Sequence, residues 1–101
     1  MSNKRILIVE DNSDLRSLMI NFLNKQVGIS VVGEASNGIE ALDFLLKHEV
    51  DIMLLDIMLP IMDGFVLLEK MRCIDKHSFP TVIVISSLAR SDFIKYVLFY
   101  P

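Results

Sequence analysis

The sequence predicts an α/β fold in which helices cover both faces of a parallel sheet. Short apolar runs alternate four times with segments of helical period, which is the pattern of consecutive βαβ units. The runs are continuously apolar, as expected for strands buried on both faces of a sheet. The connections are short, so right-handed crossovers should place all four strands side by side.

Length and composition restrict the class of protein. The chain has 101 residues, a hydrophobic content of 52% and a net charge of −3, so we expect one domain over residues 1–101. Its apolar runs are too short for a membrane span or a secretory signal. Without a basic stripe, we expect no direct binding to nucleic acid or membrane. Cys73 has no cysteine partner, which fits a cytoplasmic location and a small buried side chain.

The first predicted strand and helix occupy the N-terminal quarter of the chain. Residues 5–9 contain an apolar run that stops at Glu10 and Asp11. Asn12, Ser13 and Asp14 are candidate N-caps, and Asp14 places an acidic side chain in the first helical turn. One helical face is apolar: Leu15, Leu18, Met19, Phe22 and Leu23.

A second strand and helix follow Gly28. Residues 29–33 form a weaker strand, and residues 36–38 a turn. Asn37 and Glu40 have the spacing of a capping box, which predicts the start of the next helix. Its expected apolar face contains Ile39, Leu42, Leu45 and Leu46.

The third and fourth strands occupy the second half of the chain. Residues 52–55 form an apolar run that ends at Asp56, and a helix is expected after Gly64. Pro80 precedes the β-branched run 81–85, a strong strand signal. Ser91 and Asp92 predict the start of a last helix, which would reach Leu98.

Asp56 is the unusual residue in the third strand. An ionised carboxylate among apolar side chains is costly unless it is paired, metal-bound or protonated. At the C-terminal end of a parallel strand it would face the crevice where open α/β sheets bind ligands. Taken alone, this stretch allows an equally good alternative, in which Asp56 is a solvated turn residue.

The predicted topology brings further polar residues to the same edge. Glu10 and Asp11 end the first strand, and Ser86 ends the fourth, although Ser86 could simply serve a turn. Clustered carboxylates repel each other unless a cation neutralises them. Only oxygen ligands are present, so a hard cation such as Mg²⁺ fits best.

This constellation suits phosphoryl transfer. A carboxylate beside a bound metal ion can attack phosphorus and form an aspartyl phosphate. Asp56 is the best-placed nucleophile because it ends the central strand. Glu10 and Asp11 would then be acids on the metal side, and the hydroxyl of Ser86 could hydrogen-bond the transferred group.

The same motifs resemble the receiver domain of bacterial two-component response regulators. The acid pair follows Ile6-Leu7-Ile8-Val9, and Leu54-Leu55-Asp56-Ile57-Met58-Leu59-Pro60-Ile61-Met62-Asp63-Gly64 is similar to the phosphoacceptor strand and loop of that family. Val84-Ile85-Ser86 is similar to its fourth strand and terminal hydroxyl residue. The resemblance extends from residue 4 to about residue 98 and is specific because several motifs coincide.

The resemblance implies a flavodoxin-like doubly wound sheet with strand order 2-1-3-4. It implies that Asp56 accepts a phosphoryl group from a phosphohistidine of a sensor histidine kinase or phosphotransfer protein. Mg²⁺ would be held by Asp11, Asp56 and the backbone carbonyl of Met58, whereas Glu10 would act mainly through water. Ser86 would hydrogen-bond the attached phosphoryl group. Such a domain catalyses only its own phosphorylation and dephosphorylation, so we do not expect an enzyme acting on other substrates.

The C-terminal end departs from the family pattern. The family's fifth strand, with its functional lysine, and the fifth helix are absent from these 101 residues. We therefore expect residues 81–85 to form an exposed apolar edge, and the protein to form homo-oligomers through that edge and residues 99–101. The missing lysine also leaves an alternative function, a phosphorylation-independent interaction or dimerisation module.

Overall fold

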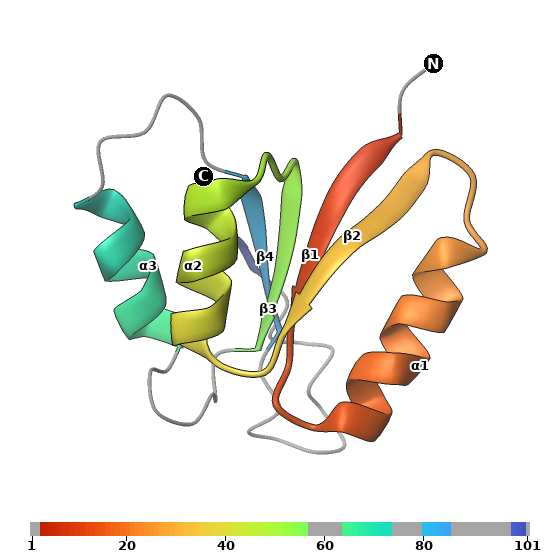
Figure 1. Ribbon diagram of the computed structural model, residues 1–101, viewed down its shortest axis with the longest axis horizontal. Helices are drawn as coiled ribbons and strands as arrows, with labels where there is room; N and C mark the ends of the chain where they lie inside the picture. The colour runs from red at the N-terminus through yellow and green to blue at the C-terminus, as the bar shows by residue number, and fades with distance from the viewer. Residues whose placement is uncertain (1–2, 57–63, 74–79, 86–97, 101) are drawn as a thin grey trace.

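The computed structural model describes residues 3–56, 64–73, 80–85 and 98–100. These residues form one sheet with α1 on one side and α2 and α3 on the other (Figure 1). The elements are β1 (Lys4–Val9), α1 (Ser13–Asn24), β2 (Ile29–Ala35), α2 (Gly38–Lys47), β3 (Ile52–Asp56), α3 (Gly64–Arg72), β4 (Thr81–Ile85) and β5 (Leu98–Tyr100).

The strand order is β2-β1-β3-β4-β5, and the first four strands are parallel. The predicted α/β fold with strand order 2-1-3-4 is therefore confirmed. β1 pairs with both β2 and β3, so that Ile6 lies opposite Val31 on one side and Ile52 on the other. This central position explains why β1 is a continuous apolar run.

The first two helices begin where the sequence predicts. The side chain of Asn12 accepts a hydrogen bond from the amide of Leu15 at 2.9 Å, and Asn37 accepts one from the amide of Glu40, also at 2.9 Å. The Glu40 carboxylate reaches back to Ser36 rather than to Asn37, bonding both its amide and its hydroxyl. Each contact satisfies a backbone or side-chain donor at a helix start.

The hydrophobic core lies mainly between the sheet and the α2–α3 layer. Its buried side chains come from β1, β3 and β4 and from both helices: Leu7, Val9, Ala41, Leu45, Met53, Leu55, Leu67, Leu68, Met71, Val82 and Val84. By contrast, α1 contains no buried residue. Among the described residues, the buried cluster therefore lies mainly on the α2–α3 side of the sheet.

The apolar helical faces are wider than the buried ones. In α1, which contacts β1 and β2, Met19 and Leu23 are half-buried, whereas Leu18 and Phe22 are 66% and 65% exposed. In α2, Leu45 is buried, but Ile39 and Leu46 are exposed. A single helix contacts a sheet along a narrow line, so apolar side chains on the flanks of that line stay accessible.

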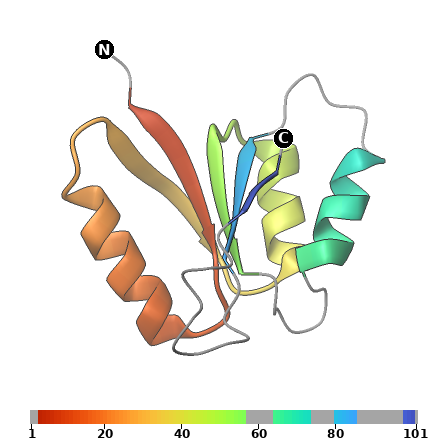
Figure 2. The ribbon, with the colours of Figure 1, turned by 180° about the vertical axis from the view of Figure 1, so that it is seen from behind.

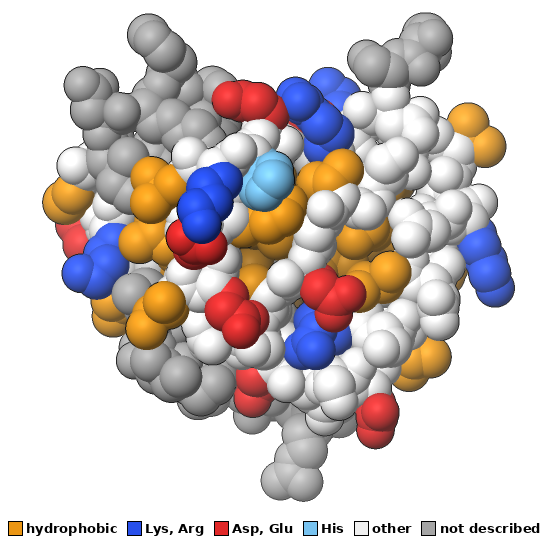
Figure 3. All heavy atoms as spheres, viewed as in Figure 1, with side chains coloured by type: hydrophobic (Ala, Val, Ile, Leu, Met, Phe, Trp, Pro, Cys, Tyr) orange, Lys and Arg blue, Asp and Glu red, His pale blue; other side chains and the backbone are white. Residues whose placement is uncertain are grey.

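Charged side chains separate many of the exposed apolar ones on the face drawn in Figure 3. In the part of the chain that the structure describes, no helix has both the length and the apolar character needed to cross a bilayer.

Three expectations about the C-terminal half are wrong. Cys73 is exposed at the end of α3 rather than buried. The edge of β4 is not open, because β5 pairs with it in antiparallel orientation, with Phe99 opposite Ile83 (Figure 2). A short apolar segment that folds back satisfies backbone groups that would otherwise be unpaired. Leu98 belongs to this strand and not to a helix, and the rest of the predicted last helix, residues 91–97, lies outside the described residues.

Candidate functional site

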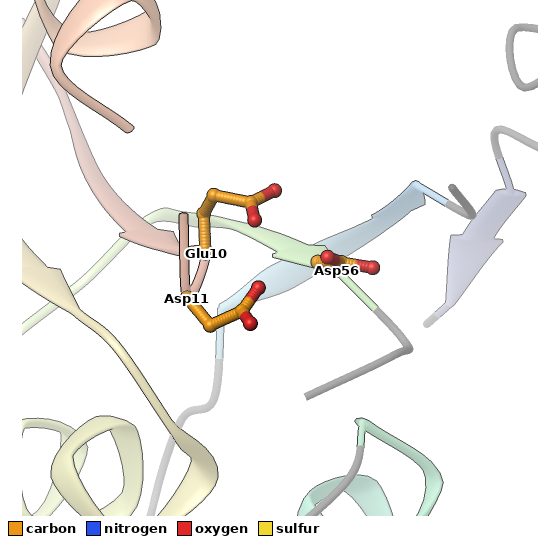
Figure 4. A group of neighbouring side chains, drawn as sticks. All are labelled: Glu10, Asp11 and Asp56. Carbon is orange, nitrogen blue, oxygen red and sulfur yellow. The ribbon is translucent and has the colours of Figure 1, made fainter. Parts of the chain in front are cut away.

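Three carboxylates meet where β1 and β3 end. Glu10 and Asp11 directly follow β1, and Asp56 is the last residue of β3 (Figure 4). One carboxylate oxygen from each residue lies within 4.8 Å of the others. Glu10 and Asp56 are only 7% and 6% exposed, whereas Asp11 is open to solvent. The structure thus brings these three residues together at one edge of the sheet, as the topology predicted.

The turn from β1 to α1 fixes the two consecutive acids. The amide of Glu10 donates to the carbonyl of Ala35 in β2 at 3.0 Å, which extends the pairing of the sheet beyond β1. The amide of Asn12 donates to the Glu10 carboxylate at 3.1 Å. The carbonyl of Glu10 accepts a 2.7 Å hydrogen bond from the guanidinium of Arg16 in α1. Backbone and side chain of Glu10 are thus held at three points.

Burial raises the pKa of Glu10 from its ordinary value of 4.5 to about 7. The hydrogen bond from Asn12 opposes this shift, while the charges of Asp56 and Asp11 and a hydrogen bond with Asp11 add to it. A carboxyl group whose neighbours are also acidic is difficult to ionise. Near neutral pH, the site therefore has an incompletely ionised acid that a cation would help to ionise.

The donor set suits a divalent hard cation. Two buried carboxylates and one exposed carboxylate provide oxygen ligands, and the open side of Asp11 leaves room for water. Among the described residues, none of the ion pairs involves Glu10 or Asp11. Mg²⁺ characteristically combines one or two carboxylates with water and phosphate oxygens. The residues present therefore fit Mg²⁺.

At the opposite end of the β1–β3 pair, the carboxylate is paired with a basic side chain. Asp51, just before β3, accepts hydrogen bonds from the backbone amide of Arg5 at 2.7 Å and from its guanidinium at 3.1 and 3.2 Å. The hydrogen bonds from Arg5 lower the pKa of Asp51 from 3.8 to about 2. Here the fold itself supplies the compensating cation.

Two predicted site residues, Met58 and Ser86, lie outside the described residues, and their roles stay predictions. The sequence analysis missed Arg16 and its partner Glu34, which is in β2 and accepts a 2.7 Å hydrogen bond from Arg16 Nε. A helical repeat identifies only the apolar face of α1. It contains no signal for a polar contact between α1 and β2.

The comparisons with known proteins agree with this fold. The sequence matches the response regulator receiver domain family over residues 6–98. This chain therefore belongs to the receiver domain family of two-component response regulators, as its motifs indicate.

Two curated relatives differ greatly in length. Sporulation initiation phosphotransferase F of Bacillus subtilis is 37% identical over 95 residues, which cover 94% of this chain and 73% of that protein. Protein-glutamate methylesterase/protein-glutamine glutaminase 1 of Methanospirillum hungatei is 38% identical over 84 residues, which cover 83% of this chain but only 24% of that protein. The match to the methylesterase is thus limited to a small part of it.

Solved structures share the fold. The response regulator domain of Thermotoga maritima CheB has a TM-score of 0.76 and 28% identity, over 85% of this chain and 62% of that one. The CheX–CheY–BeF3–Mg²⁺ complex of Borrelia burgdorferi contains a chain with a TM-score of 0.73 and 30% identity, over 93% of this chain and 69% of that one. Both likenesses cover most of this chain.

Proposed function

We propose that this chain is a single receiver domain that accepts a phosphoryl group on Asp56 in a Mg²⁺-dependent reaction. The donor would be a phosphohistidine on a sensor histidine kinase or a phosphotransfer protein. The observation that carries this proposal is the cluster of Glu10, Asp11 and Asp56, whose oxygens lie within 4.8 Å of one another at the C-terminal edge of the sheet. Carboxylates clustered in this way repel one another, and a bound cation relieves that repulsion.

In this proposal Asp56 is the nucleophile. A lone pair on its carboxylate oxygen attacks phosphorus, the bond from phosphorus to the histidine nitrogen breaks, and the imidazole leaves with the bonding electrons. Asp11, Asp56 and the carbonyl of Met58 would hold Mg²⁺, while Glu10 would act mainly through coordinated water. The metal, when bound, offsets negative charge on the transferring group. Ser86 would donate a hydrogen bond to the attached phosphoryl group.

The relatives support the proposal by analogy. One is named a phosphotransferase, and a solved relative was studied as a complex with CheX, BeF3 and Mg²⁺. We propose the same kind of ligand for this chain: a divalent cation beside a phosphoryl group. We further propose a cytoplasmic location, because a kinase that draws on ATP works there, and no enzymatic activity beyond phosphorylation and dephosphorylation of the domain itself.

The alternative expected from the sequence was a phosphorylation-independent interaction or dimerisation module, because the family's fifth-strand lysine is missing. Homo-oligomerisation was expected through an unpaired β4, but residues 82–84 pair with β5. Homo-oligomerisation therefore stays a prediction without this support. We prefer the phosphoacceptor function because Glu10, Asp11 and Asp56 lie together, and no uptake of phosphoryl groups by folded, Mg²⁺-binding protein would favour the alternative.

The test is intact-mass spectrometry after incubation with Mg²⁺ and a small-molecule acyl phosphate. Wild-type protein should gain the mass of one phosphoryl group, and hydroxylamine should remove it. Asp56→Asn should gain none. Asp51→Asn is a matched control, since it removes a carboxylate from the other end of the same strand, and it should be phosphorylated like the wild type.

Equal uptake by the wild type and Asp56→Asn would overturn the assignment of the acceptor. Unchanged uptake after removal of all divalent cations would overturn the requirement for Mg²⁺.

A further inference from the structure

Arg16 is close to the acidic cluster but contacts none of its carboxylates in the hydrogen bonds described above. Its Nη1 donates to the backbone carbonyl of Glu10, and its Nε donates to the carboxylate of Glu34, both at 2.7 Å. The side chain is only 17% exposed, whereas that of Glu34 is 54% exposed. One guanidinium therefore links the turn that carries Glu10 and Asp11 to the neighbouring strand β2.

The location of Arg16 indicates that its side chain serves as a donor to the carbonyl of Glu10. It lies near the N-terminus of α1, where the helix dipole disfavours a positive charge. The carbonyl of Glu10 lies just beyond β1 in a residue that is 7% exposed, and a buried carbonyl needs a donor. A charged donor makes a stronger hydrogen bond than a neutral one, and the planar guanidinium can bond two partners at fixed angles.

Glu34 completes the arrangement. A lone cation beside the acidic cluster would repel an incoming metal ion, but the carboxylate of Glu34 neutralises Arg16. The guanidinium can therefore fix the position of the turn without adding net positive charge to the site. Arg16 and Glu34 together act through geometry and charge balance rather than as ligands.

We propose that Arg16 is a positioning residue, which with Glu34 holds the Glu10–Asp11 turn in a geometry that binds Mg²⁺. This inference rests on the proposed function. Residues that orient metal ligands from a second layer typically change metal affinity by about 10- to 100-fold when they are substituted. We therefore expect Arg16→Gln to raise the Kd for Mg²⁺ by about 10-fold.

The sign of this effect separates the proposal from simple electrostatics. Arg16→Gln makes the protein more negative, which on charge alone would tighten Mg²⁺ binding. Lys47→Gln is the matched control, because it removes one positive charge from an exposed ion pair with Asp43 on α2. We expect the control to bind Mg²⁺ as tightly as the wild type or slightly more tightly.

Glu34→Gln tests the charge balance. It leaves Arg16 bonded to the carbonyl of Glu10 but without its neutralising partner, so Mg²⁺ binding should weaken at low salt and recover as salt increases. The loss in Arg16→Gln should persist at high salt because it comes from altered geometry. Arg16→Lys, which keeps the charge but cannot bond both partners in the same way, should lie between wild type and Arg16→Gln.

Calorimetric titration with MgCl2 gives these affinities. Amide hydrogen exchange without Mg²⁺ gives an independent readout: the Asn12 amide, which donates to the Glu10 carboxylate, should exchange faster in Arg16→Gln than in Lys47→Gln. If Arg16→Gln does not fold, Arg16→Lys and Glu34→Gln carry the test. Wild-type affinity and wild-type exchange in the Arg16 variants would overturn the inference, whereas a wild type that binds no Mg²⁺ would overturn the proposed function instead.

Discussion

Carboxyl groups at the two ends of the β1–β3 pair have pKa values shifted in opposite directions. Where the strands begin, Asp51 is bound to the backbone and guanidinium of Arg5, and its pKa is lowered to about 2. Where they end, Glu10 has its pKa raised to about 7 by burial and by its acidic neighbours. An acid that stabilises the fold comes with its own cation. The cluster of three carboxylates and the raised pKa of Glu10 indicate a site for an external cation.

The largest effect is expected when a positively charged side chain is introduced among Glu10, Asp11 and Asp56. Asp11→Lys changes an exposed position, so the fold should tolerate it. The substitution would place a positive charge beside Glu10 and Asp56 and remove one of the proposed Mg²⁺ ligands. We expect the affinity for Mg²⁺ to fall by about 100-fold or more, measured by calorimetry.

The same variant should have a higher Tm than the wild type when Mg²⁺ is absent, because the repulsion among the acids is relieved. Asp11→Asn separates the two effects, since it removes the ligand without adding a cation. A metal-free Tm of Asp11→Lys below that of Asp11→Asn would contradict the view that a positive charge at this position stabilises the cluster.

The next effect concerns pH. Glu10 has a folded-state pKa of about 7 against an ordinary 4.5, so the folded protein binds a proton more tightly than the unfolded chain does. Without metal, stability should therefore fall as the pH rises from about 4.5 to about 7. We expect a loss of roughly 1–2 kcal/mol, reduced by solvent screening on the side of Asp11. Urea unfolding across this pH range measures it.

Two comparisons sharpen that measurement. Glu10→Gln should remove the fall in stability, because an amide does not titrate. Saturating Mg²⁺ should oppose the fall in the wild type and bind more tightly as the pH rises through 7, since Glu10 then becomes ionised. A metal-free wild type whose stability rises from pH 4.5 to 7 would contradict the assignment of this pKa.

The smallest effect on stability is expected at the other end of the β1–β3 pair, where Asp51 lies. Asp51→Asn removes an acid whose lowered pKa stabilises the fold, fully above pH 3.8 and progressively less as the pH falls toward 2. We expect a small decrease in Tm at neutral pH and no decrease near pH 2. Because this end is solvent-exposed, screening limits the change. Thermal unfolding followed by circular dichroism measures it.

Arg5→Lys is the milder companion to that variant. It keeps a cation near Asp51, and the backbone amide of residue 5 can still donate to the carboxylate. Neither variant should change Mg²⁺ affinity, because the contact lies at the far end of the strands. A clear loss of Mg²⁺ binding in Asp51→Asn would show that the two ends are not independent.

Topology explains why much of the site could be predicted from the sequence. Parallel strands place their C-terminal ends at one edge, so residues that follow β1 and β3 must be neighbours whatever their separation in the chain. Asp11 and Asp56 are such residues, and the structure brings them together. Periodicity and capping likewise predicted where α1 and α2 begin.

Contacts between elements were harder to predict. The pairing of Arg16 with Glu34 depends on how α1 lies across β2, which no local pattern records. The repeat of α1 identified its apolar side but not that Leu18 and Phe22 would remain exposed. The strand formed by residues 98–100 was missed because three residues are too few for a periodic signal, and only β4 beside them makes them a strand.

The pairing of β1 with β3 has a consequence for the newly made chain. Residues 46 positions apart, such as Arg5 and Asp51, must come together before this pair exists, and closing so long a loop is a slow, entropically costly step of folding. The acidic cluster is assembled by the same pairing. Under the proposed function, a chain in which β1 and β3 have not paired has no assembled acceptor site, so phosphorylation would be limited to molecules in which the centre of the sheet has formed.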